Sequence, residues 1–215
     1  MIYISIFRRS KMIATDIQEK LLTRRAVKQY DPAFKLSQDE ILDLLDAANK
    51  APSAWNLQHW KFMVVHSDEG KQKLLPIAFN QQQIVDASAV IVILGDKEAN
   101  KNIDEICAPD IQKGRMTDDI KERLASQVNN VYQNEHYAYE AAVMNSTFPA
   151  MQIMNFATLR DLGTCAIGGF NRTQLIESFN IDERYVPTML ITVGKSIKTP
   201  RETDRRDVQT ITEFH

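Results

Sequence analysis

The apolar run at residues 87–94, ASAVIVIL, constrains the fold more than any other segment of this chain. Its β-branched residues favour extended backbone. The run does not alternate between apolar and polar positions, which indicates a strand covered on both faces. Gly95 and Asp96 end it, and the run is far shorter than the about 20 residues that a membrane-spanning helix needs. We therefore predict the central strand of a sheet inside a globular domain.

Helices and further strands surround this strand, without the regular alternation of a parallel α/β domain. Ser37 and Glu40 form a capping box, which predicts the start of a helix. The other predicted elements are helices at residues 13–25, 71–79 and 118–131, a helix capped by Asn171, and strands at residues 61–66 and 187–193. No GxGxxG motif follows a strand, so a Rossmann domain is not expected. The predicted fold class is α+β, with a sheet of about four or five strands flanked by helices.

Residues 137–162 form a long helical stretch with apolar side chains on nearly every side. This pattern indicates a helix buried in the core or in a dimer interface. Pro149 predicts a kink or a division into two helices, because proline lacks the amide hydrogen that a helix needs. The polar residues 100–117 predict a mobile loop or a short helix, with a lid as one role, and Cys107 is expected to be exposed there.

Composition and charge exclude several classes of protein. A net charge of −2 gives no reason to expect nucleic acid or an anionic membrane as a partner. The four histidines and two cysteines show no metal-ligand spacing, so no metal site is predicted. Two widely separated cysteines suit the reducing cytoplasm, which is the expected location. Residues 1–11 lack the order of a targeting segment and are predicted to be an N-terminal extension before a single domain at residues 12–215.

Three segments suit the binding of a small ligand, and each has a plainer alternative. Arg24, Arg25 and Lys28 can meet a phosphate dianion, or they form a solvated face at a helix end. Residues 51–60, APSAWNLQHW, offer Asn and Gln side chains to a uracil-like edge, as in a flavin or a pyrimidine, or they form a structural turn. Residues 166–170, AIGGF, let backbone amides approach a planar ligand, or they form a strand-to-helix turn.

The tail at residues 195–215 is polar and basic and has no core of its own. Such a tail is usually solvated. Held against a neighbour, however, Arg201, Arg205 and Arg206 would complete a phosphate site. Cys165, beside the glycine-containing segment, is interpreted as a buried small residue.

The order and spacing of five segments resemble those of the nitroreductase family. They are TRRAVKQYD at 23–31, APSAWNLQHWKF at 51–62, NQQQIVDASAVIVIL at 80–94, GTCAIGGF at 163–170 and MLITVGK at 189–195. Each is modestly specific by itself, whereas all five in this order are strongly specific. More narrowly, the chain is similar to the small bacillus-type NAD(P)H nitroreductases linked to quinone handling. The resemblance implies a central mixed or antiparallel sheet, an extended C-terminal tail and a homodimer with two FMN sites, each built from both subunits.

The resemblance also implies which residues bind the FMN phosphate, ribityl chain and pyrimidine edge. These are Arg24, Arg25 and Lys28, with Ala26 where many members have serine, and Arg205, which completes the phosphate site. The partner subunit is expected to contribute Pro52, Ser53, Ala54 and Asn56.

Two further segments are implied near the flavin ring. Asn80 and Gln83 occupy positions that often touch the ribityl chain or the isoalloxazine ring. The flavin face near N5 would be lined by the backbone of Ala166, Ile167, Gly168 and Gly169, with Gly168 as the expected amide donor.

The implied activity transfers electrons from NADH or NADPH to small planar acceptors, nitroaromatics or quinones, in two steps through the flavin. Because the flavin carries this chemistry, no side chain is expected to be catalytic. Two alternatives stay open. One keeps the flavin in a dehalogenase or a dehydrogenase, and the other is a non-catalytic FMN-binding redox sensor.

Overall fold

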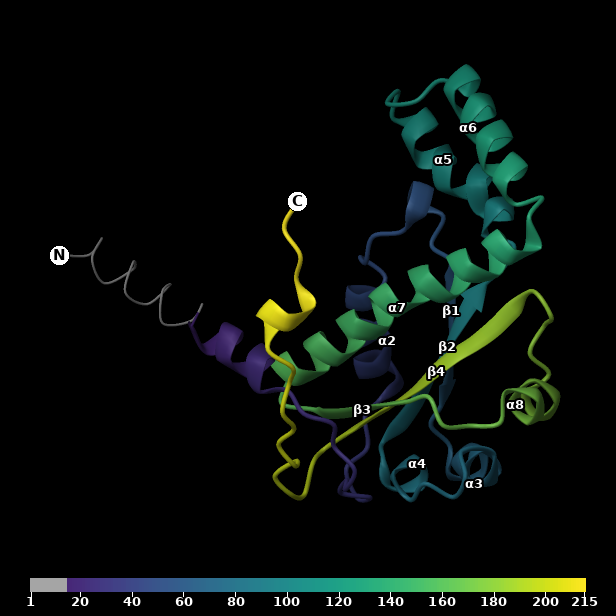
Figure 1. The fold of residues 1–215 in the computed structure, drawn as a ribbon. Helices are drawn as coiled ribbons and strands as arrows, with labels where there is room; N and C mark the ends of the chain where they lie inside the picture. The colour runs from purple at the N-terminus through teal and green to yellow at the C-terminus, as the bar shows by residue number, and fades with distance from the viewer. Residues whose placement is uncertain (1–14) are drawn as a thin grey trace.

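The computed structural model describes residues 15–215, so the predicted extension at residues 1–11 lies outside the described residues. At its centre is a four-stranded sheet with strand order β1-β2-β4-β3 (Figure 1). The strands are β1 (Trp60–Val65), β2 (Ala89–Asp96), β3 (Gly163–Ile167) and β4 (Tyr185–Gly194). Each neighbouring pair is antiparallel. The predicted α+β class and the antiparallel sheet are therefore confirmed.

Helices cover both faces of this sheet. They are α2 (Gln38–Ala48), α3 (Asp68–Ile77), α4 (Gln83–Asp86), α7 (Glu135–Leu159) and α8 (Arg172–Phe179). Ile91 and Ile93 of β2 share one apolar cluster with α2 and α7, whereas Val90 and Val92 share another with α3, α4 and α8. Every residue of β2 is buried. Because side chains alternate along a strand, this double cover explains why residues 89–94 are apolar at every position.

Two helix starts match their predicted caps. The Glu40 amide donates to Ser37 Oγ at 3.2 Å, and the Ser37 amide donates to Glu40 Oε2 at 2.8 Å. At the start of α8, the Gln174 amide donates to Asn171 Oδ1 at 3.0 Å. These bonds satisfy amides that have no partner inside the helix, which is why such starts are visible in the sequence.

α7 runs as one helix of 25 residues through Pro149, so the predicted division at this proline is wrong. An internal proline costs a helix about 3 kcal/mol. Against this cost, α7 is packed on both sides of the proline, with Asn145, Ser146, Ala150 and Ile153 all buried. The helix contacts α2 and all four strands, and this burial outweighs the missing amide bond.

The segment after β2 folds into a helical hairpin that projects from the sheet (Figure 1). This α5–α6 hairpin consists of η2 (Ala99–Asn102), α5 (Ile103–Gln112) and α6 (Asp118–Val131). The predicted bounds of α6 are confirmed. For residues 100–117 a mobile loop or a short helix was predicted, and the structure has the short helix α5 there. Cys107 is buried in the hairpin's own apolar cluster, so its predicted exposure is wrong. No helix within residues 15–215 is long and apolar enough to span a bilayer.

His59 lies between η1 (Ala54–Asn56) and β1 and is fully buried. Neither ring nitrogen has a hydrogen-bond partner within residues 15–215. The ring stacks on Tyr132 with 6.4 Å between centroids. Burial lowers the pKa of His59 to about 4, against an opposing effect of the Asp96 carboxylate. The fold therefore keeps this imidazole neutral where an exposed one takes up a proton.

We predict that the free energy of unfolding decreases as the pH falls from 6.5, the ordinary histidine pKa, to about 4. In that window the unfolded chain binds a proton at His59 that the folded chain does not bind. Below it both states bind the proton and the contribution stops changing. At about 1.4 kcal/mol per pKa unit, the loss amounts to at most about 3.5 kcal/mol.

Urea unfolding across this pH range checks the prediction. His59→Phe is expected to show a shallower pH dependence than the wild type. His66→Phe, at an exposed position just after β1, is the matched control and is expected to keep the wild-type dependence. Equal slopes for the wild type and His59→Phe would contradict the prediction.

Candidate functional site

A short basic segment, residues 24–28, follows the helix at residues 15–23 and runs beside β3. The Val27 amide donates to the Thr164 carbonyl at 2.9 Å, and Ala26 forms a bridge with Thr164. A Cβ at Gly163 would lie 2.6 Å from Val27 Cγ2, so glycine is what lets the segment approach the strand this closely. This pairing fixes the basic segment against the edge of the sheet.

The basic segment and the C-terminal tail line a pocket of about 450 Å³, which we call the basic pocket. Among the residues that the structure describes, its lining holds no carboxylate and six cations: Arg24, Arg25, Lys28, Lys198, Arg201 and Arg205. The salt bridges within residues 15–215 leave all six unpaired. In the same range, Arg25 Nε is buried without a hydrogen-bond partner. Such a lining suits a polyvalent anion, and the guanidinium forks suit phosphate oxygens.

Residues far apart in the sequence therefore meet in the basic pocket. Arg24, Arg25, Ala26 and Lys28 line it together with Arg205 of the tail. Arg206 is not among the lining residues, although Arg201 is. Lys198 was missed by sequence reasoning, because a single lysine in a polar tail carries no local signal.

β3 leads from the basic segment to Gly168 and Gly169, and we call the last two strand residues together with these glycines, residues 166–169, the glycine loop. Gln81 Nε2 donates to the Gly169 carbonyl at 2.9 Å, and Gln83 Nε2 donates to Gln81 Oε1 at 3.3 Å. Gln83 Nε2 also lies 3.8 Å from Cys165 Sγ. The segment that carries Asn80 and Gln83 is thus held beside the glycine loop, and Gln81, which holds it there, was not singled out from the sequence.

Neither glycine of this loop is needed for packing within the described chain. A Cβ at Gly168 would meet no described atom within 4 Å, and a Cβ at Gly169 would come no nearer than 3.9 Å to Gln81 Nε2. Neither glycine has a positive φ. The loop backbone is therefore open to an outside group. Gly168 lies about 13 Å along the strand from Thr164, so a ligand with an anionic end and a flat end can lie along this edge.

The predicted residues Pro52, Ser53, Ala54 and Asn56 lie elsewhere in the protomer. The Ala54 amide donates to Asn145 Oδ1 at 2.9 Å, in the middle of α7. The basic segment lies near the C-terminal end of the same helix, where Thr158 and Arg24 line one small cavity. Thirteen residues of helix separate Asn145 from Thr158, or about 20 Å. Within one protomer the structure does not bring these residues to the basic pocket, and their contribution from a partner subunit stays a prediction.

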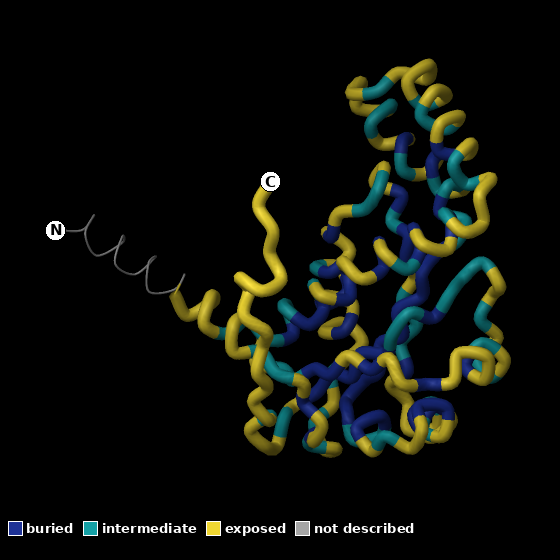
Figure 2. The backbone as a smooth tube through the Cα atoms, viewed as in Figure 1, coloured by how far each residue is buried: buried dark blue, intermediate teal, exposed yellow. Residues whose placement is uncertain are grey.

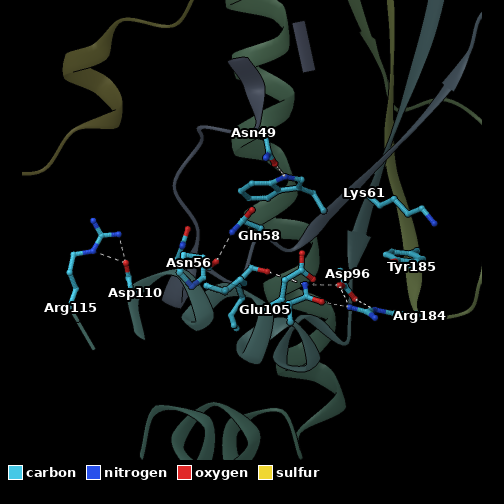
Figure 3. Close-up of a pocket in the computed structure, with 15 residues that line it drawn as sticks. Asn49, Asn56, Gln58, Lys61, Asp96, Glu105, Asp110, Arg115, Arg184 and Tyr185 are labelled. Carbon is cyan, nitrogen blue, oxygen red and sulfur yellow. Dashed lines mark hydrogen bonds and ion pairs between the residues drawn. The ribbon is translucent and has the colours of Figure 1, made fainter. Parts of the chain in front are cut away.

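A second cavity, of about 570 Å³, lies between the loop at residues 53–58, α5 and the sheet (Figure 3). Three cations and three acids line it: Lys61, Arg115, Arg184, Asp96, Glu105 and Asp110. Arg115 pairs with Asp110, and Arg184 pairs with Asp96. Because its charges balance, this polar cavity is a poorer anion site than the basic pocket.

Large apolar side chains are exposed on α7 and on the tail. Met144, Phe148 and Met151 follow one another at helical spacing along one face of α7 and are all exposed. Figure 2 shows the tail exposed along its length, and Val208 and Phe214 are exposed within it. The prediction that α7 is buried on nearly every side therefore holds for only part of its surface in the protomer. Large exposed apolar side chains in line along one helix face are typical of an interaction surface.

Comparisons with known proteins agree with this geometry. A sequence model of the Nitroreductase family matches residues 21–195. YodC of Bacillus subtilis (strain 168), an NAD(P)H nitroreductase by name, is 49% identical over 191 residues, which cover 89% of this chain and 95% of YodC. The CLA biosynthesis enone reductase of Lactiplantibacillus plantarum is 29% identical and covers 94% of this chain and 96% of its own length.

The fold is shared with solved structures as well. A protein from Exiguobacterium sibiricum 255-15, named as a nitroreductase and solved in complex with FMN, has a TM-score of 0.87 and 32% sequence identity. The match covers 93% of this chain and 97% of that chain. This chain belongs to the nitroreductase family.

Proposed function

We propose that this chain is an FMN-dependent oxidoreductase that passes electrons from NADH or NADPH to small planar acceptors, nitroaromatics or quinones. The observation that carries the proposal is the basic pocket, with six unpaired cations and no carboxylate, at one end of an edge strand whose other end is an open glycine loop. FMN has the matching chemistry, since it joins a phosphate to a flat ring. Two buried free cysteines are compatible with a cytoplasmic location.

The residues of this chain would meet the parts of FMN in order along the edge that β3 forms. Arg24, Arg25 and Arg205 would bind the phosphate oxygens, and the unpartnered Arg25 Nε would gain an acceptor there. Lys28 would lie toward the ribityl chain and the pyrimidine edge. Ala26 would contribute backbone only, because alanine offers no side-chain hydrogen bond.

The glycine loop would hold the ring. Ala166, Ile167, Gly168 and Gly169 would present backbone to its face, with the Gly168 amide as the donor to N5. Asn80 and Gln83 would flank the ribityl chain or the ring, and the Gln81 bond to the Gly169 carbonyl keeps their segment in place.

Bound FMN supplies the hydride chemistry, so the protein supplies position, charge and exclusion of water. None of its side chains is required as a nucleophile. The cations of the basic pocket fix the cofactor by its phosphate, and this leaves the ring face free for a donor and then an acceptor in turn. A planar, electron-poor acceptor suits such a face because it can stack on the ring.

We propose a homodimer in which Pro52, Ser53, Ala54 and Asn56 of the partner subunit complete each flavin site. The separation of about 20 Å within one protomer supports this arrangement. So do the exposed apolar face of α7 and the exposed apolar residues of the tail, which a second copy of the chain would cover.

Optical spectra test the proposed activity. Purified protein reconstituted with FMN is expected to lose flavin absorbance when NADH or NADPH is added without oxygen. The absorbance is then expected to return on addition of a quinone or a nitroaromatic. An enone and a halogenated aromatic complete the acceptor panel. Failure to bind FMN would contradict the proposal, and bound FMN that neither donor reduces would favour a redox sensor.

Arg205→Ala tests the phosphate site. Loss of one charge-assisted hydrogen bond costs about 1.5–3 kcal/mol of binding, which is about 10- to 150-fold in the dissociation constant for FMN. Fluorescence titration of the FMN-free protein measures this constant. Arg206→Ala removes the neighbouring charge outside the pocket lining and is expected to bind nearly as the wild type does. Equal affinities for the two variants would contradict the assignment.

A further inference from the structure

The loop at residues 53–58 has an unusual backbone. Trp55, Asn56 and Gln58 have φ values of 50°, 57° and 51°, in the left-handed region that non-glycine residues rarely adopt. Asparagine tolerates this region better than most residues, whereas for Trp55 and Gln58 it is sterically unfavourable. Such a conformation persists only where its surroundings hold it, and strained backbone of this kind gathers at functional sites.

One side of the loop is held by α7. The buried Asn145 accepts from the Ala54 amide at 2.9 Å through Oδ1 and donates to the Ala141 carbonyl at 2.7 Å through Nδ2. Because Nδ2 is engaged with a carbonyl, Oδ1 is the atom that faces the loop. Within the loop, the Gln58 amide donates to Ser53 Oγ at 2.9 Å.

The other side of the loop is held by a polar network at the rim of the polar cavity (Figure 3). Asn102 Nδ2 donates to the Leu57 carbonyl at 3.1 Å, and the Asp96 amide donates to the His59 carbonyl at 3.0 Å. Arg184 joins Asn102 and Asp96. Its Nη2 donates to Asn102 Oδ1 at 2.7 Å and to Asp96 Oδ2 at 2.6 Å, while its Nε donates to Asp96 Oδ1 at 2.7 Å.

The network also ties the loop to the α5–α6 hairpin. Asn102 is the last residue of η2, directly before α5. Leu57 is fully buried in the hairpin's apolar cluster with Ile103 and Val128. Contacts from α7, from the end of β2 and from the base of the hairpin therefore hold the loop, and Arg184, just before β4, links the last two.

We infer that Asn145 and the Arg184–Asp96–Asn102 network are positioning residues of the flavin site. They hold the 53–58 loop in the strained shape in which Ser53, Ala54 and Asn56 would meet FMN bound to the partner subunit. The inference rests on the proposed function. It goes further in assigning a role to four residues that would not themselves touch the cofactor.

Asn145→Ala and Asn102→Ala test the inference from opposite sides of the loop. Ser146→Ala is the matched control, because Ser146 is the next residue of α7, is fully buried and, within residues 15–215, bonds through its side chain only to Val143 and Thr188. Both test variants are expected to weaken FMN binding about tenfold or more, as loss of one hydrogen bond that orders a site predicts. Ser146→Ala is expected to stay within about twofold of the wild type.

Amide hydrogen exchange in the FMN-free protein gives a second readout that does not depend on the cofactor. The Ala54 amide is expected to exchange faster in Asn145→Ala, and loop amides near Leu57 faster in Asn102→Ala, with both unchanged in Ser146→Ala. Melting temperatures identify a test variant whose whole fold is destabilised. In that case the other test variant, on the opposite side of the loop, is compared with Ser146→Ala.

Two outcomes would overturn the inference, and they can be told apart. If the wild type binds FMN and both variants bind it as tightly as Ser146→Ala does, the positioning role is wrong while the proposed function stands. If the wild type binds no FMN, the proposed function fails, and the positioning role fails with it.

Discussion

The backbone pairing between the basic segment and β3 is the contact on which the rest of the site depends. The Val27 amide donates to the Thr164 carbonyl, and Gly163 has no Cβ that would collide with the Val27 side chain. These two contacts place several cations along the edge of the sheet. The same strand ends in the open glycine loop. A cation cluster and an accessible backbone thus occupy the two ends of one rigid element, which is how a fold presets the geometry of an extended ligand.

The distribution of charge favours one of the two cavities as an anion site. The chain as a whole carries −2, yet the basic pocket gathers six cations without a carboxylate. The polar cavity balances its charges and uses two of its cations, Arg115 and Arg184, in ion pairs. Unpaired like charges held close together repel one another, and a bound polyvalent anion would relieve this repulsion.

Local patterns predicted much of the fold, and long-range contacts account for most of what they missed. The cap at Ser37, the buried run at residues 87–94 and the helix at residues 118–131 depend on neighbours in sequence, and all three are confirmed. Pro149 and Cys107 were misjudged because tertiary packing overrode a local rule. Arg184 and Asp96 lie 88 positions apart, and no local pattern joins them. The resemblance identified the candidate site residues. The roles of Lys198, Gln81 and Asn145 depend on contacts between distant parts of the chain, which only the structure shows.

We propose that two copies of the chain build each flavin site, and native mass spectrometry of the FMN-loaded protein tests this arrangement. One dominant species of two chains with two FMN molecules is expected, from which the cofactor is lost as the chains separate. A monomer that retains one FMN as firmly as the dimer would contradict it, because such a monomer would need nothing from the partner's 53–58 loop.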